Sequence, residues 1–310
     1  MTAVTLPCGV ESLPGKPGHG PIGSGFLERT GPDVKILISA DMEGATGVTW
    51  PADVMPGTPE WQRCRSMFTS DVNAAVLGFF DGGADEVLVN EAHSTMRNLL
   101  LEQLDERVEM LTGRHKSLSM VEGVQHGDVD GIAFVGYHGG AGMEGVLAHT
   151  YLANSLTGVW LNDVRASEGL LNARVVAEYG VPVILVTGDD VACEDALGYA
   201  PEALKVAVKD HVSRYAAVCR APARTAADIR AAAKEATRLA VRQEPSADGP
   251  FTVAVEFDAE HLAMAATVVP GVARIGERKI AYTSGTMYEG IRTFKAVTTI
   301  VSAAIEEQYG

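Results

Sequence analysis

Residues 34–44 read Val-Lys-Ile-Leu-Ile-Ser-Ala-Asp-Met-Glu-Gly, a short β-rich run that stops at two acidic residues. An apolar run of this length, bounded by turn residues, is typical of a buried strand. Residues 59–81 then carry apolar side chains at helical spacing, and Gly82 and Gly83 follow as expected at a helix end. A second short apolar run spans residues 86–90. The order strand, helix, strand predicts a parallel pairing.

The same alternation continues along the chain. Further all-apolar runs at residues 131–136 and 183–187 predict two more strands. Between them Ser167, a favoured helix-capping residue, precedes Glu168 and a helix through Tyr179. Strands that are apolar throughout are covered on both faces. The sequence therefore predicts an α/β fold, with a largely parallel sheet and helices on both of its faces.

Changes in composition predict three parts of the chain. Residues 1–33 are rich in Pro and Gly, which cannot pack a core, and are expected to form a flexible extension. Residues 34–220 hold the alternating pattern and form the expected α/β domain, which contains all the candidate site residues described below. Residues 221–310 form a smaller α+β region, in which the expected elements are a helix over about 225–242, strands at 251–257 and 279–282, and a helix over about 287–307.

Charge and hydropathy restrict the classes of partner. The chain of 310 residues has a formal net charge of −15, which argues against nucleic acid as a partner. It contains neither an apolar run long enough to cross a membrane nor a basic start followed by an apolar stretch. We therefore expect a cytoplasmic protein without membrane contact. The cysteines are widely spaced and are expected to be free thiols: Cys8, Cys64, Cys193 and Cys219.

Metal-capable side chains follow three of the predicted strands. Asp41 and Glu43 follow the first strand, His93 the second and His138 the third. In open α/β sheets, ligands bind outside the carboxyl ends of the strands, so these side chains can converge. Residues at i and i+2 of an extended chain point to the same side, and two adjacent carboxylates repel each other unless a cation lies between them.

Each of these signals alone has a simpler interpretation. Asp41 and Glu43 could be solvated turn acids, and either histidine could be a hydrogen-bonded structural residue. Together, two histidines and two carboxylates form a ligand set suited to Zn²⁺, and one carboxylate could bridge two ions. Glu168 is equally a fifth ligand or a helix N-terminal acid that the helix dipole favours.

Other polar residues near the expected site are less defined. His149 could act as an acid or base, because imidazole titrates near neutral pH, or it could be a further ligand or a surface residue. Asp189 and Asp190, at the end of the fourth strand, are interpreted as turn or ligand-supporting acids. The sequence contains no H-E-x-x-H, G-x-S-x-G, P-loop or post-strand G-x-G-x-x-G motif. A Ser or Cys nucleophile therefore has no local support.

The ordered motifs resemble those of a known family, the DppA-type zinc D-aminopeptidases. Ser39 to Gly44 is similar to the family signature S-x-D-x-E-G. Other similar segments follow in family order: Val87 to Ser94, Ser119 to Gly123, Gly136 to His138 and Leu170 to Ala173. The resemblance runs from about Val34 to the C-terminus. Residues 1–33 have no counterpart, and residues 139–142 differ from the family pattern.

The resemblance implies a set of residue roles and an activity. It assigns two zinc ions per subunit to Asp41, bridging both ions, and to Glu43, His93, His138 and Glu168. It assigns the catalytic histidine to His149, as acid/base or nucleophile. Members cleave N-terminal D-residues, typically D-Ala, from short peptides and assemble into ring-shaped homo-oligomers. The sequence thus predicts a dinuclear zinc D-aminopeptidase. The alternatives are another two-metal amidase or phosphoesterase, or a non-catalytic metal-binding protein.

Overall fold

The structure of the protein, a computed structural model, describes residues 33–306. The expected N-terminal extension (except Asp33) and Cys8 lie outside these residues. The three described cysteines, Cys64, Cys193 and Cys219, are free thiols, as expected. Within the described part, no helix combines the length and apolar character that crossing a bilayer requires.

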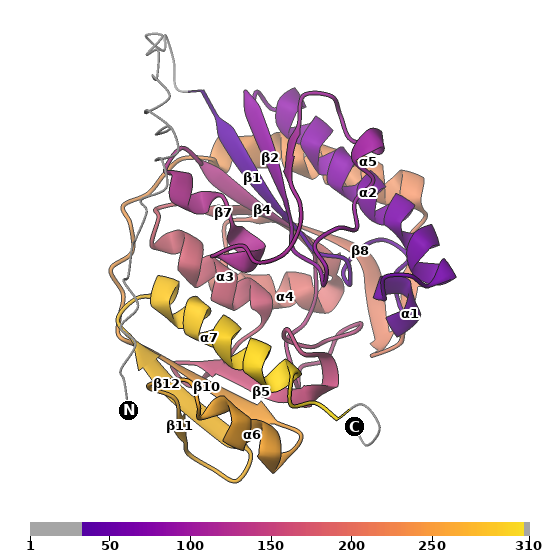
Figure 1. Ribbon diagram of the computed structural model, residues 1–310. Coiled ribbons are helices and arrows are strands. Elements are labelled where there is room, and N and C mark those ends of the chain that lie inside the picture. The colour runs from indigo at the N-terminus through magenta and orange to yellow at the C-terminus, as the bar shows by residue number, and fades with distance from the viewer. Residues whose placement is uncertain (1–32, 307–310) are drawn as a thin grey trace, which may run out of the picture. The chain divides into compact units, whose positions relative to one another are not determined.

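A seven-stranded sheet forms the centre of the fold (Figure 1), with strand order β3-β2-β1-β4-β7-β8-β9. All neighbouring strands run parallel except β8 and β9, which confirms the predicted largely parallel sheet. The bounds are β1 (Lys35–Ala40), β2 (Glu86–Glu91), β3 (Glu109–Leu111), β4 (Gly131–Tyr137), β7 (Val183–Asp189), β8 (Leu204–Ser213) and β9 (Ala216–Cys219).

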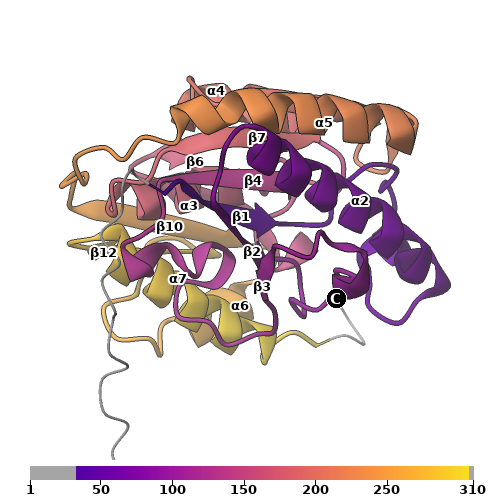
Figure 2. The same cartoon turned by 90° about the horizontal axis from the view of Figure 1, so that it is seen from above.

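Helices cover both faces of this sheet. Helices α2 (Pro59–Asp81) and α5 (Pro222–Ala236) lie side by side on one face, and α3 (Glu168–Ala177) and α4 (Asp190–Tyr199) lie on the other (Figures 1 and 2). Strand β1 contributes side chains to the hydrophobic cores on both faces of the sheet, because successive strand residues point to opposite faces. Ile36 and Ile38 pack in the cluster of α2 and α5, whereas Leu37 packs in the cluster that contains α3.

A second, antiparallel sheet has the strand order β11-β12-β10-β5-β6. Helix α7 (Met287–Ser302) contacts its strands β10 and β12 as well as α3, and the short helix α6 (Glu260–Ala266) packs beside α7. Two strands of this second sheet precede residue 221, so the expected domain boundary between residues 220 and 221 stays a prediction. The strands are β5 (Leu156–Leu161), β6 (Val164–Arg165), β10 (Phe251–Phe257), β11 (Ala273–Arg274) and β12 (Lys279–Ser284).

Local signals explain several helix ends. Thr58 caps α2 by accepting a hydrogen bond from the Trp61 amide, and Ser167 caps α3 as predicted, accepting from the Leu170 amide at 3.1 Å. The remaining elements are α1 (Pro51–Val54) and 3-10 turns at Leu101–Gln103, Ser119–Val121, Val124–His126, Ala153–Ser155 and Thr237–Leu239.

Three expectations differ from the structure. The helix expected over about 225–242 is α5, which begins at Pro222 and ends at Ala236. The last helix ends at Ser302 instead of reaching residue 307. The stretch between residues 190 and 220, to which the sequence pattern assigned no element, folds as α4, β8 and β9.

The carboxyl ends of β2, β1 and β4 lie next to one another. Ala40, the last residue of β1, is in register with Glu91 of β2 and Val135 of β4. Strand β1 continues into α2 on one face, whereas the chain after β4 leads to α3 on the other. The connections thus change face between β1 and β4, which is where open α/β sheets bind ligands.

Candidate metal centre and active site

Asp41 lies at the centre of a cluster of acids and histidines at this sheet edge. Its Oδ1 is 3.5 Å from His93 Nδ1, and its Oδ2 is 3.3 Å from His138 Nε2. All three side chains are buried, because the ends of β1, β2 and β4 meet here beneath the loops that follow them. One carboxylate thus faces two imidazoles, one from each neighbouring strand.

Two potential metal-binding groups share Asp41. The first is Asp41, Glu43 and His93, and the second is Asp41, His138 and Glu168; the ligand atoms of each group lie within 4.8 Å of one another. Glu43 Oε2 is 2.9 Å from His93 Nδ1, and Glu168 Oε2 is 3.6 Å from His138 Nε2. Each group supplies two carboxylates and one imidazole, a donor set that suits Zn²⁺.

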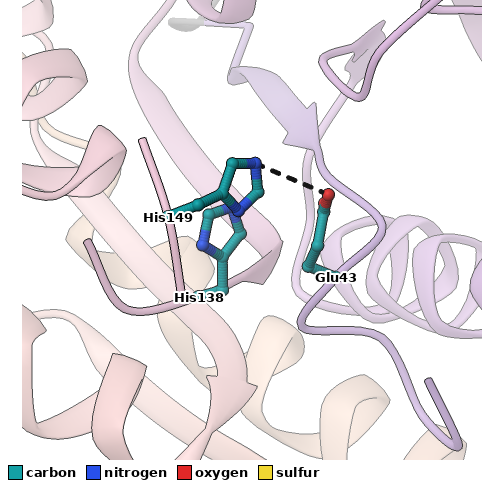
Figure 3. A group of neighbouring side chains, drawn as sticks. All are labelled: Glu43, His138 and His149. Carbon is teal, nitrogen blue, oxygen red and sulfur yellow. Dashed lines mark ion pairs between the residues drawn. The ribbon is translucent and has the colours of Figure 1, made fainter. Parts of the chain in front are cut away.

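A third group joins Glu43 and His138 to His149 (Figure 3). His149 Nε2 is 3.8 Å from Glu43 Oε1. The rings of His149 and His138 are stacked, with centroids 4.4 Å apart and planes 2° from parallel. His149 therefore borders both of the other groups, and its side chain is more exposed than theirs, at 15%.

Each histidine is oriented by a backbone carbonyl. His93 Nε2 lies 2.8 Å from the Val54 carbonyl, and His138 Nδ1 and His149 Nδ1 each lie 2.9 Å from the carbonyls of Gly139 and Leu147. A carbonyl only accepts hydrogen bonds, so the ring nitrogen facing it carries the hydrogen. In the neutral form, the other ring nitrogen then points its lone pair at the carboxylates, the arrangement found in metal-ligating histidines.

Unsatisfied buried atoms in the cluster indicate that a cation belongs there. Asp41 Oδ2, Glu43 Oε2 and His138 Nε2 are buried and form no acceptable hydrogen bond with any described residue. Glu43 Oε2 and His138 Nε2 are within ion-pair distance of a partner but are not aligned for a hydrogen bond. Buried polar atoms without partners are costly, and a bound cation would satisfy all three. The residues present therefore fit a metal ion.

The charges of the cluster are strongly coupled. Burial opposes ionisation of Asp41, but the nearby imidazoles of His138 and His93 outweigh it and hold the pKa of Asp41 well below its usual value. Burial likewise lowers the pKa of His93, but the charges of Glu43 and Asp41 raise it well above its usual value. The pKa of His138 is also raised, mainly by Glu168 against burial. The carboxylates therefore attract positive charge, either as protons on the histidines or as metal ions.

Two glycines allow β1 and β4 to approach closely at the site. A Cβ on Gly44 would lie 1.9 Å from the Tyr137 carbonyl oxygen, and one on Gly136 would lie 2.0 Å from the Asp41 carbonyl oxygen. Gly136 also has φ +78°, which only glycine adopts without strain. The Gly44 amide donates to the Gly136 carbonyl at 2.7 Å. This close contact holds Asp41 and Glu43 opposite His138.

A buried lysine supports the loop that carries Glu43. Lys209 of β8 is fully buried, and its ammonium group donates to the carbonyls of Glu43, Ala45 and Val48 at 2.6, 2.9 and 2.6 Å. Burial lowers the pKa of Lys209 to about 8. Three carbonyls on one ammonium group fix the path of the loop, which places the Glu43 carboxylate.

Two acids outside the loop complete the support. Glu168 accepts from the Tyr151 amide through Oε1 at 2.7 Å, which leaves Oε2 directed at His138. Asp189 caps α4 through the Ala192 amide and also accepts from the Val146 amide at 2.6 Å, which anchors the loop before His149. Asp189 thus supports the site without joining it, in line with its interpretation from sequence.

All six predicted site residues therefore meet at one place: Asp41, Glu43, His93, His138, His149 and Glu168. Asp190 does not join them, since its carboxylate accepts from the His211 amide. The supporting Lys209 was not predicted. It lies in the alternating stretch Lys205 to Asp210, in which nothing distinguishes a buried lysine from an exposed one.

Comparisons with known proteins identify relatives of this chain. A family model described as D-aminopeptidase matches residues 34–296. A D-aminopeptidase of Bacillus subtilis (strain 168) is 37% identical over 191 residues, which is 62% of this chain and 69% of that protein. The solved structure of the Zn-dependent D-aminopeptidase DppA from Bacillus subtilis, described as a self-compartmentalizing protease, matches with a TM-score of 0.82. That match has 30% sequence identity and covers 87% of this chain and 98% of that one.

Proposed function

Because the chain belongs to the D-aminopeptidase family, whose members are metallo-aminopeptidases, we propose that it binds two zinc ions and removes N-terminal D-residues, of the D-Ala type, from short peptides. The observation that carries this proposal is the position of Asp41. Its two carboxylate oxygens face different histidines, and each histidine has a second carboxylate beside it. A shared carboxylate of this kind suits a two-metal hydrolase.

The proposed ligands divide into two sets around Asp41. Glu43 and His93 hold one ion, and His138 and Glu168 hold the other. Zinc in such a site lowers the pKa of bound water and polarises a carbonyl group. The protein residues fix the positions of the donor atoms through the carbonyl groups behind the histidines and through Lys209 behind Glu43.

His149 is the proposed acid and base. Its Nδ1 donates to the Leu147 carbonyl, so Nε2, which faces Glu43, is free to take up a proton and return it to the leaving amine. Direct attack by the same nitrogen is the alternative role. In either role, His149→Ala should retain its zinc and lose turnover by about 100-fold or more. An equal loss of zinc would make His149 a ligand instead.

The decisive experiment combines elemental analysis of the purified protein with hydrolysis assays. We expect two zinc ions per chain and cleavage of D-Ala-D-Ala, with little cleavage of L-Ala-L-Ala or of a phosphate ester. Cleavage of the phosphate ester, or equal rates on the two peptides, would favour another two-metal amidase or phosphoesterase.

Metal removal separates an enzyme from a metal-binding protein. Treatment with EDTA should abolish hydrolysis, and added Zn²⁺ should restore it. If the untreated, zinc-loaded protein hydrolyses none of the substrates, and EDTA changes only its stability, the protein is a metal binder without this activity.

The proposal extends to assembly and location. The matched DppA is described as a self-compartmentalizing protease, and we propose that this chain also forms a closed, ring-shaped homo-oligomer around its active sites. The cytoplasmic location stays a prediction, as does the absence of a nucleic-acid partner.

A further inference from the structure

The metal cluster opens into a cavity whose lining also contains cationic side chains. The cavity has a volume of about 490 Å³ and includes Asp41, Glu43 and Glu168 in its lining. Three cationic side chains line it as well: Arg114 and Lys116, from the loop after β3, and Lys295 of α7. The chain as a whole has a net charge of −15, so three cationic side chains on one cavity wall differ from its average composition.

Lys116 is a fixed part of this wall. It is only 9% exposed, and its ammonium group donates to Asn90 Oδ1 at 2.6 Å and to the Glu91 carbonyl. An ammonium group has three N–H donors, so one remains for the cavity. Burial lowers the pKa of Lys116 to about 8, which shows that the protein offsets its charge only partly.

Lys295 and Arg114 add charge beside it. Lys295 donates to the Lys116 carbonyl, which joins α7 to this loop. Arg114 is exposed, and its guanidinium has no hydrogen-bond or ion-pair partner within residues 33–306. Burial lowers the pKa of Lys295 and the charge of Glu122 partly offsets this, while the Glu122 carboxylate oxygens already accept from the Leu118 amide and from Gln125. Glu91 and Glu122 act on Lys116 through their charge, but no carboxylate of the described residues lies within ion-pair distance of Arg114, Lys116 or Lys295.

An additional donor lies in the same wall. The Tyr151 hydroxyl is buried and has no acceptable hydrogen-bond partner among the described residues. It lines the cavity together with Ser119. Buried hydroxyl groups are normally paired, so this one indicates an acceptor that enters from the cavity.

We infer that Arg114, Lys116 and Lys295 bind the C-terminal carboxylate of a short peptide whose N-terminal residue lies at the metal cluster. The inference rests on the proposed aminopeptidase function and adds a limit on substrate length. A short peptide whose N-terminal residue lies at the metal cluster carries its carboxylate at the other end, and the three cations line the same cavity. Because an extended residue spans roughly 3.3–3.6 Å, a cavity of this size suits peptides of about two or three residues.

The test compares a peptide acid with its amide. The zinc-loaded protein should cleave D-Ala-Gly-Gly with a kcat/KM about tenfold higher than that for D-Ala-Gly-Gly amide, mainly through KM; tenfold corresponds to about 1.4 kcal/mol. Arg114→Gln and Lys295→Gln should each reduce this acid-to-amide ratio several-fold. Raised ionic strength should reduce it too, because salt screens exposed charges.

A matched control removes an equal charge elsewhere. Arg63 is exposed on α2, its guanidinium has no hydrogen-bond or ion-pair partner within the described part of the chain, and it does not line the cavity, so Arg63→Gln should leave the ratio unchanged. A wild-type ratio near one would overturn the inference. A ratio that Arg114→Gln and Lys295→Gln leave unchanged would overturn it as well.

A binding measurement separates this inference from the proposed function. Calorimetric titration of the zinc-loaded His149→Ala variant with the same two peptides should show tighter binding of the acid. If the wild type hydrolyses neither peptide but the variant still prefers the acid, the proposed function fails and the carboxylate site stands. If both peptides are hydrolysed and the variant binds them equally, the carboxylate site fails and the proposed function stands.

Discussion

At the scale of single residues, Asp41 contacts more of the proposed metal ligands than either of the other two acids does. Its two oxygens face His93 and His138, which come from the strands on either side of β1. Glu43 and Glu168 each reach only one of these histidines. Removal of Asp41 should therefore affect both proposed metal positions, whereas removal of Glu168 should affect one.

Metal content tests this difference between the acids. Asp41→Asn should reduce zinc from two ions per chain to less than one after dialysis, and Glu168→Gln should retain about one, because an amide is a weak zinc ligand. Elemental analysis measures the outcome. Glu144→Gln, which changes an exposed acid in the loop between His138 and His149, is the control and should retain both ions. Full retention by Asp41→Asn would contradict its shared position.

Asp71 provides a pH-dependent prediction away from the cluster. Burial raises its pKa to about 6, although it accepts hydrogen bonds from the Thr46 amide and hydroxyl at 2.8 and 2.9 Å. In the unfolded chain its pKa is about 3.8, so between pH 3.8 and 6 the folded state holds the proton more tightly. Asp71 therefore contributes stability at low pH that is lost as the pH rises through 6.

The Asp71→Asn variant isolates this contribution. From pH 5 to pH 7.5 the wild type should lose about 1.4 kcal/mol of unfolding free energy relative to Asp71→Asn, because pH 5 is one unit below the folded pKa. Denaturant unfolding of metal-free protein at the two pH values measures it. A constant difference between the two proteins would show that the pKa of Asp71 is not raised.

At the scale of elements, the site depends on how closely β1 and β4 approach. Gly44, in the loop after β1, and Gly136 of β4 lie where any side chain would overlap the backbone of the opposite segment. Strand and helix ends set the remaining geometry, since His138 follows β4 directly, His93 lies two residues after β2, and Glu168 is the first residue of α3. The cluster is therefore a property of the sheet edge more than of any one loop.

Substitution of the close-approach glycine tests this dependence. Gly136→Ala should lower the unfolding free energy by about 3 kcal/mol, because it combines left-handed backbone strain with overlap on the Asp41 carbonyl, and hydrolysis should fall with it. Gly198→Ala is the control, since a Cβ there meets nothing within 4 Å and should stabilise α4 slightly. Equal stability of the two variants in denaturant unfolding would contradict this dependence on close approach.

Much of this arrangement was predictable from the sequence. The elements and residues that the sequence did not predict were missed for physical reasons. Apolar runs that end in polar residues predicted β1, β2, β4 and β7, and the rule for parallel sheets placed their ends together. The stretch from Asp190 to Cys219 lacks long apolar runs, because β9 is the edge strand and β8, next to it, is only partly buried. Lys116 and Lys209 were not predictable, because their burial depends on carbonyl groups from distant segments.

At the scale of the whole molecule, a group of exposed apolar side chains is relevant to the proposed assembly. Val212 of β8 and Val218 of β9, two strands joined by a short turn, are 63% and 62% exposed. Trp50 is 55% exposed and contacts Tyr215 of the same turn edge-on, at 5.2 Å between ring centroids. Exposed apolar patches of this kind mark contact surfaces between proteins.

Sedimentation measurements test the assembly. The wild type should sediment with several times the mass of one chain, and the double substitution Val212→Asp with Val218→Asp should shift it towards smaller species. Val164→Asp, at an equally exposed position on β6, is the control and should leave the mass unchanged. A fully active single chain would contradict a ring-shaped assembly.

The carbonyl groups behind His93, His138 and His149 have a consequence for the order of events during metal uptake. Because the rings are already turned towards the carboxylates, an arriving ion meets donors that need no rotation. We therefore expect the speed of capture to depend on how readily the ion releases its own hydration shell. Mg²⁺, which dehydrates reluctantly, should enter far more slowly than Zn²⁺ in stopped-flow mixing, so the site would discriminate between ions by rate as well as by affinity.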